Sequence, residues 1–216
     1  TTLAHAVWAS DADIDLMAAS GCSVVHNTIS NLKLGAGVAP VRRLIDAGVP
    51  VGLGTDGLSS NDTACIFDVM RVAALIQNVA NSEPDRWLSA ETVLEAATLG
   101  GARSALLAHE TGSLEVGKAA DLLMLDLSTY AFMPLNDIAK HLAYAENGSS
   151  IRLVMVNGEI VFEDGRLQTV NEAAILEEIR DAMPAILAQH SEYEAQSAVY
   201  RPYMEEIQRR ASGYGM

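Results

Sequence analysis

The chain has 216 residues, of which 50% are hydrophobic and 19% charged, and a formal net charge of −14 at pH 7. This apolar content predicts a buried core and excludes a disordered chain. The acidic charge argues against nucleic acid or an anionic membrane surface as a partner. No apolar run is long enough to span a bilayer. Cys22 and Cys65 lie in apolar contexts, which favours reduced, buried thiols and a cytoplasmic protein.

The first eighty residues predict alternating strands and helices. Residues 2–7, 23–26 and 51–55 are short apolar runs typical of buried strands. Helices are expected at residues 11–19, 41–47 and 66–79, each with a start or stop signal or helical spacing of apolar residues. Residues 27–38 are expected to be a loop. Strands separated by helices in this order indicate parallel βαβ units.

Each of the three predicted strands ends at or near a residue that can move a proton or bind a metal. These residues are His5, His26 and Asp56, and Asp56 is followed by a short polar loop that contains glycine. Barrel enzymes present catalytic groups in this way, at the carboxyl ends of their strands. A single such residue is more often a hydrogen-bonded strand end, but three in series favour a functional site.

The middle of the chain changes character. Helices are expected at residues 90–99 and 102–107, with a break at Gly100-Gly101. Strands are expected at residues 120–125, 151–156 and 159–163, with a helix near residues 136–145, and Asn157-Gly158 is a two-residue signal for a type I′ hairpin. Residues 112–167 therefore predict a small antiparallel β element.

The tail, residues 171–210, predicts amphipathic helix interrupted at Pro184 and Pro202. Its apolar stripe indicates a core or oligomer contact. The stripe contains Ile175, Leu176, Ile179, Met183, Ile186 and Leu187.

Several motifs, in the same order along the chain, carry a family resemblance. They are the segments AHAVW (residues 4–8), HNTISNLKLG (26–35), GTDG (54–57) followed by Ser60-Asn61, GSLEVGKAADL (112–122) and VNGEIV (156–161). Together they resemble the amidohydrolase superfamily, in the branch of triazine hydrolases and adenosine- and guanine-type deaminases. The resemblance implies an α/β fold made of the last strands of a (β/α)8 TIM barrel (residues 1–110), part of a small β-sandwich (111–168) and C-terminal helices (169–216).

The resemblance also implies roles for individual residues. Asp56 matches the carboxylate that binds the metal and shuttles the proton of the attacking water, and His5 matches the histidine that stabilises the charge developing in that attack. One divalent metal is implied, zinc in the first place and iron as the alternative. Candidates for shaping the substrate site are Trp8, His26, Asn31, Ser59 and Asn61, with a loop-stabilising role as the other interpretation.

One part of the family pattern is missing. The family takes a His-x-His pair from its first barrel strand and another histidine from its fifth, and this chain has no His-x-His. Asp56 alone cannot hold a catalytic zinc, which needs at least three protein ligands. The sequence, which starts without methionine, therefore predicts the back part of a longer barrel, inactive alone and completed by an N-terminal half in the same or another chain.

Three functions remain open at this point. The parent protein is expected to deaminate a purine, pyrimidine or triazine-like ring, so its partner is a small heterocyclic substrate, and it is expected to be a homo-oligomer. A hydrolase of the same fold that displaces halide or an amide amine is the first alternative. A binding module that keeps only a relic of the site is the second.

Overall fold

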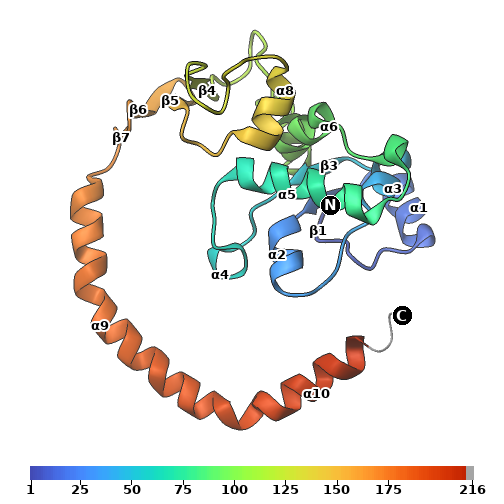
Figure 1. The fold of residues 1–216 in the computed structure, drawn as a ribbon, viewed down its shortest axis with the longest axis vertical. Coiled ribbons are helices and arrows are strands. Elements are labelled where there is room, and N and C mark those ends of the chain that lie inside the picture. The colour runs from blue at the N-terminus through green and yellow to red at the C-terminus, as the bar shows by residue number, and fades with distance from the viewer. Residues whose placement is uncertain (213–216) are drawn as a thin grey trace. The chain divides into compact units, whose positions relative to one another are not determined.

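The computed structural model describes residues 1–212, and the chain divides into two units, Thr1–Arg166 and Leu167–Met216. The first unit contains two sheets and the helices around them, and the second contains the C-terminal helices (Figure 1). No helix in the described part of the chain has the length and apolar character needed to cross a membrane.

The first unit contains a three-stranded parallel sheet of order β1-β2-β3. In it Leu3 pairs with Val24, and Val25 pairs with Gly52. The parallel βαβ order predicted from the sequence is therefore confirmed. The strands and the helices that follow them are β1 (Thr2–Ala4), α1 (Asp11–Ser20), β2 (Ser23–His26), α2 (Thr28–Lys33), α3 (Val41–Asp46), β3 (Val51–Leu53), α4 (Leu58–Asn61) and α5 (Ile66–Ala80).

The core lies around this sheet, where Val24, Leu44 and Val69 have no exposed surface. Helix α1 is fixed at its start by a capping box, in which the Ser10 side chain accepts from Asp13 N and the Asp13 carboxylate accepts from Ser10 N. Both bonds satisfy backbone donors that the first helical turn leaves free. The cap therefore fixes where α1 begins after β1.

Two short helices lie in segments that the sequence predicted to be irregular. Helix α2 lies inside the expected loop of residues 27–38, and α4 forms directly after Gly57. Both are too short to show helical periodicity in the sequence. The first strand is also shorter than expected, because His5 and Ala6 have φ angles of 69° and 51°, which end extended structure.

A continuous helical run crosses the glycine pair at which a break was predicted. It comprises α6 (Ala90–Glu95), the π-helical turn η2 (Ala96–Gly100) and α7 (Gly101–Ser104). A Cβ atom on Gly100 would lie 2.2 Å from Val51 O. The glycine is therefore required by close helix–strand packing, and the predicted break was wrong.

The second sheet is antiparallel, with order β4-β5-β6-β7, as the hairpin signal at Asn157-Gly158 predicted. Its strands are β4 (Leu122–Leu125), β5 (Ile151–Val156), β6 (Glu159–Glu163) and β7 (Arg166–Leu167). The other short helices of this part of the chain are η1 (Pro84–Arg86), α8 (Ile138–Lys140) and η3 (His141–Ala145).

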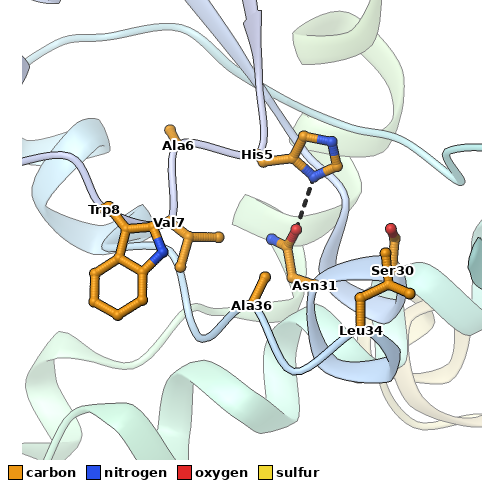
Figure 2. Close-up of a pocket in the computed structure, with 8 residues that line it drawn as sticks. All are labelled: His5, Ala6, Val7, Trp8, Ser30, Asn31, Leu34 and Ala36. Carbon is orange, nitrogen blue, oxygen red and sulfur yellow. Dashed lines mark hydrogen bonds between the residues drawn. The ribbon is translucent and has the colours of Figure 1, made fainter. Parts of the chain in front are cut away.

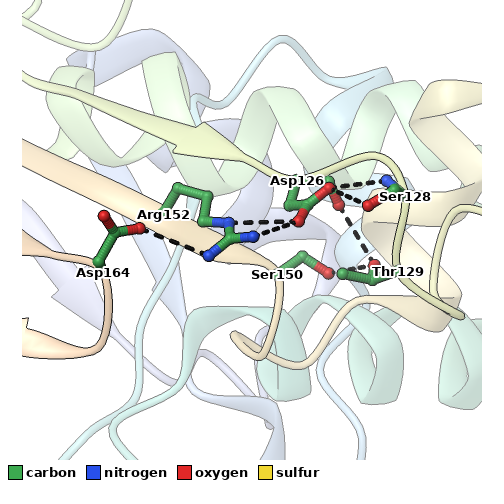
Figure 3. A network of polar contacts seen from close by, with 6 residues as sticks. All are labelled: Asp126, Ser128, Thr129, Ser150, Arg152 and Asp164. Carbon is green, nitrogen blue, oxygen red and sulfur yellow. Dashed lines mark hydrogen bonds and ion pairs between the residues drawn. The ribbon is translucent and has the colours of Figure 1, made fainter.

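A polar network joins three neighbouring segments of this sheet (Figure 3). Arg152 on β5 donates to Asp126, which follows β4, with nitrogen–oxygen distances of 2.8 and 3.2 Å, and pairs with Asp164 after β6 at 3.4 Å. Hydrogen bonds from the side chain and backbone of Ser128, with Arg152, lower the pKa of Asp126 to about 2.

The second unit consists of α9 (Glu172–Ser197), the 3-10 turn η4 (Ala198–Tyr200) and α10 (Arg201–Ser212). The predicted interruption at Pro184 is wrong, because α9 continues through that proline. Pro202 lies in the first turn of α10, where the missing N–H costs no helical hydrogen bond. The helix therefore changes character only at η4.

Candidate active site

The ends of β1 and β3 bring His5 and Asp56 together. His5 Nε2 lies 3.9 Å from Asp56 Oδ2, and both residues adopt left-handed backbone, with φ of 69° and 60°. Such conformations are uncommon outside glycine and concentrate at functional sites. Both side chains are partly open to solvent, with 43% and 31% exposed. They are therefore accessible to a small molecule.

Two hydrogen bonds hold the Asp56 carboxylate. Ser30 Oγ on α2 donates to Oδ2 at 2.5 Å, and Gly57 N donates to Oδ1 at 2.8 Å. These bonds, with the Ser30 bond the larger cause, lower the pKa of Asp56 below its ordinary value. Asp56 is therefore a carboxylate at neutral pH, able to accept a proton or bind a cation. Ser30 was not among the predicted site residues, since a serine inside an expected loop gives no signal of its own.

Asn31 orients His5. His5 Nδ1 and Asn31 Oδ1 lie 2.8 Å apart, and an amide oxygen accepts, so the proton of this bond is on Nδ1. The other ring nitrogen, Nε2, is thereby directed to the side of Asp56. Asn31 is 3% exposed, so its position is set by packing.

His26 is the last residue of β2, the strand between β1 and β3. It is 1% exposed, and neither ring nitrogen has a hydrogen-bond partner among the described residues. Burial, with a smaller effect of the neighbouring His5, lowers the pKa of His26 to about 4. His26 is therefore neutral in the folded chain at neutral pH. The three strand-end residues occupy one edge of the sheet, as the sequence predicted.

A pocket of about 420 Å³ opens beside His5 (Figure 2). It combines the polar side chains of His5, Ser30 and Asn31 with apolar ones. The apolar contribution comes from Ala6, Val7, Trp8, Leu34 and Ala36. Trp8, a predicted substrate-binding residue, is 77% exposed at this pocket.

Two other predicted site residues, Asn61 and Ser59, lie on α4 and make different contacts. Asn61 is 4% exposed, and its Nδ2 donates to the backbone oxygens of Thr55 and Thr63. This amide fixes the loop after β3. Ser59 is exposed, and its backbone oxygen accepts from Lys33 Nζ at 3.1 Å.

The described residues do not form a complete metal site. Within residues 1–212, no three His, Cys, Asp or Glu side chains are grouped so that they could hold an ion. Structural and catalytic zinc sites use three or four protein ligands. A full set of zinc ligands is therefore not found among the described residues.

Comparisons with known proteins place this geometry in a family. The amidohydrolase family profile matches residues 1–161. A 5′-deoxyadenosine deaminase of Methanosarcina mazei is 39% identical over 185 residues, which are 86% of this chain and 42% of that protein.

Two solved structures share the fold. A zinc-bound adenosine deaminase from Xanthomonas campestris superposes with a TM-score of 0.83 at 35% identity, covering 87% of this chain and 42% of that one. A zinc-bound atrazine chlorohydrolase from Arthrobacter aurescens TC1 gives a TM-score of 0.76 at 35% identity, covering 82% and 39%.

The chain thus spans about two-fifths of the length of these relatives. The matched residues 1–161 nevertheless include the parallel sheet, with the edge that carries His5, His26 and Asp56, and strands β4 and β5 of the antiparallel sheet. Both the profile and the superpositions agree with the resemblance found in the sequence. The chain belongs to the amidohydrolase family.

Proposed function

We propose that the protein to which this chain contributes is a hydrolytic deaminase of adenine-type nucleosides. The observation that carries the proposal is the His5–Asp56 pair, held at 3.9 Å beside an open pocket at the carboxyl ends of parallel strands. The similarity to adenosine and 5′-deoxyadenosine deaminases supports this substrate class.

In this proposal Asp56 accepts the proton of the attacking water. Its lowered pKa keeps it ionised, so it is ready to take a proton at neutral pH. His5 Nε2 and Asp56 Oδ2 are too far apart for a direct hydrogen bond, and a water beside both atoms can contact each of them. When its ring is protonated, His5 donates from Nε2 and stabilises negative charge developing next to Asp56.

A divalent metal, zinc in the solved relatives, would lower the pKa of bound water to about 7 in favourable cases. Asp56 is the one ligand that we assign to this chain, and we propose that the other ligands come from a polypeptide segment outside it. Iron remains the alternative metal. This chain alone is expected to be inactive.

The pocket beside His5 is proposed to hold the heterocycle. Its apolar side chains, among them Val7, Trp8 and Leu34, offer surface for a flat ring or for an apolar substituent of the sugar. His5 and Asn31 on the same wall fix the reacting edge near Asp56. A nucleoside without a 5′-hydroxyl, such as 5′-deoxyadenosine, suits this lining.

The test is ammonia release from adenosine and 5′-deoxyadenosine by the complete protein. Asp56→Asn keeps the shape of the side chain and removes the proton acceptor, so turnover should fall roughly 10²–10⁴-fold. Asp62→Asn is the matched control, because Asp62 is an exposed carboxylate in the same loop, has positive φ, and pairs with Lys33. Asp62→Asn should keep near-normal turnover, and an active Asp56→Asn protein would sink the proposal.

A second candidate is displacement of halide from a triazine ring, which the superposition with the atrazine chlorohydrolase favours. Assays with a chlorotriazine and an aminopurine in parallel separate the two. Chloride release without ammonia release would replace the first proposal with the second.

A further inference from the structure

Asn27, the residue that follows β2, directs its side chain across the parallel sheet to Gly54. A Cβ atom on Gly54 would lie 2.4 Å from Asn27 Oδ1 and 2.7 Å from Val25 Cγ1. The side chains of Asn27 and Val25 therefore occupy the space that a larger residue at position 54 would fill. Because Gly54 stands two positions before Asp56, the Asn27 amide lies against the segment that leads to the candidate site.

The two faces of the sheet carry different residues of β2. Val25 meets Gly54 on one face, and successive side chains of a strand point to opposite faces. Val24 and His26 therefore point to the other face, where they are 0% and 1% exposed. Of the two polar residues at the end of β2, Asn27 is thus the one that shares a face with Gly54.

The amide of Asn27 has no hydrogen-bond partner within residues 1–212. Asn27 is the N-cap residue of α2, yet its side chain bonds to no backbone N–H of that helix. Asn171, in the same place before α9, accepts from Ala174 N. Asn27 is 6% exposed, and buried polar groups are normally satisfied. A partner for this amide is therefore expected from outside the described residues.

The chemistry of this amide fits the heterocycle of the proposed substrate. A carboxamide offers two N–H donors and one oxygen acceptor. The adenine ring presents nitrogen atoms as acceptors, and asparagine side chains recognise adenine through such a nitrogen in complexes with nucleic acids. A base that reacts beside Asp56 brings its ring nitrogens close to the amide beside Gly54.

We propose that Asn27 is a substrate-binding residue whose Nδ2 donates a hydrogen bond to a ring nitrogen of the heterocycle. The inference rests on the proposed deaminase function and adds a contact to the base. Gly54 supports this contact, because the absence of a Cβ atom leaves room for the amide. Asn27 takes no part in the proton transfer, so its effect is on the binding of the substrate.

The first experiment measures KM and kcat for adenosine with the complete protein. Asn27→Ala removes the donor and should raise KM about tenfold, with a smaller change in kcat. Gly54→Ala should raise KM in the same way, since the new Cβ displaces the amide. Asn136→Ala is the control, because Asn136 is an exposed amide before α8, and it should keep the wild-type KM. An unchanged KM in Asn27→Ala would overturn the proposal.

The second experiment separates a substrate contact from a structural role. The analogues 1-deaza-, 3-deaza- and 7-deazaadenosine each replace one ring nitrogen by a C–H group, and their dissociation constants are measured by competition with adenosine. For the analogue that lacks the bonded nitrogen, Asn27→Ala should leave the dissociation constant unchanged. The other two analogues should lose affinity about tenfold, as adenosine does. Equal losses for all three would show a structural role and overturn the proposal.

The contact and the reaction that it serves fail in different ways. If the wild-type complete protein releases no ammonia from adenine nucleosides, the deaminase function is wrong and the contact to the base falls with it. If ammonia is released and the three analogues lose affinity equally in Asn27→Ala, only the role of Asn27 is wrong.

Discussion

The two sheets of the first unit differ in whether their polar side chains have hydrogen-bond partners. At the end of β2, His26 is buried with both ring nitrogens unpaired among the described residues. In the antiparallel sheet, Asp126 is met by Ser128 and Arg152, and Arg152 also pairs with Asp164 (Figure 3). Buried polar groups are normally satisfied, and exceptions concentrate at functional sites. The unpaired histidine thus lies at the edge of the parallel sheet that we propose as the active site, whereas the polar network of the antiparallel sheet is paired.

The largest effect is expected on stability, from a substitution in the packing between the helical run and β3. Gly100→Ala places a Cβ 2.2 Å from Val51 O, a backbone atom of β3 that cannot move freely, and should destabilise the chain by about 3 kcal/mol or more. Gly101→Ala is the control, because its Cβ would meet nothing closer than 3.9 Å. Urea unfolding of both variants measures the difference. Equal stability of the two proteins would contradict the close approach of helix and strand.

The next largest effect is expected on the stability of the chain at acid pH, through protonation of His26. Its folded pKa of about 4 lies below the ordinary value of 6.5, so the unfolded chain binds the proton first as the pH falls. Stability should fall by about 3 kcal/mol between pH 6.5 and 4 on account of this group. In His26→Leu that loss should disappear from the pH profile of unfolding. His109→Leu, at an exposed histidine, should keep it.

A smaller effect is expected at Ser30. Ser30→Ala removes the hydrogen bond that contributes most to the lowered pKa of Asp56, so this pKa should rise towards its ordinary value. A carboxylate with a raised pKa is protonated at higher pH, so the acidic limb of the complete protein's activity profile should move upward. Ser20→Ala, at an exposed serine at the end of α1, is the control. An unchanged limb in Ser30→Ala would separate Asp56 from the proton transfer.

The smallest effect should come from the antiparallel sheet. Arg152→Ala removes an ion pair whose arginine is 57% exposed, and such pairs contribute little. Because the Ser128 bonds are the larger causes, the pKa of Asp126 should rise only part of the way and remain below its usual range. A titration followed by nuclear magnetic resonance measures it. A full return to the ordinary value would show that Arg152, not Ser128, dominates.

The strand-end positions of His5, His26 and Asp56 could be predicted because short apolar runs that stop at a polar residue mark buried parallel strands. The helical run through Gly100 could not, since tertiary packing against Val51 overrides the local preference of glycine. Helix α2, and with it the Ser30–Asp56 bond, was missed because six residues carry too little periodicity. The interruption predicted at Pro184 was wrong for a different reason: the long helix α9 accommodates the loss of one backbone hydrogen bond.

The positive φ angles at His5 and Asp56 also decide which substitutions can be used to study this protein. Asparagine and glycine accept left-handed backbone, whereas valine, isoleucine and threonine do not. In a saturation library at position 56, abundance of folded protein should therefore follow backbone tolerance, and activity should follow the carboxylate. Asparagine belongs to the tolerated group and lacks the charge, so it separates the two requirements at one position.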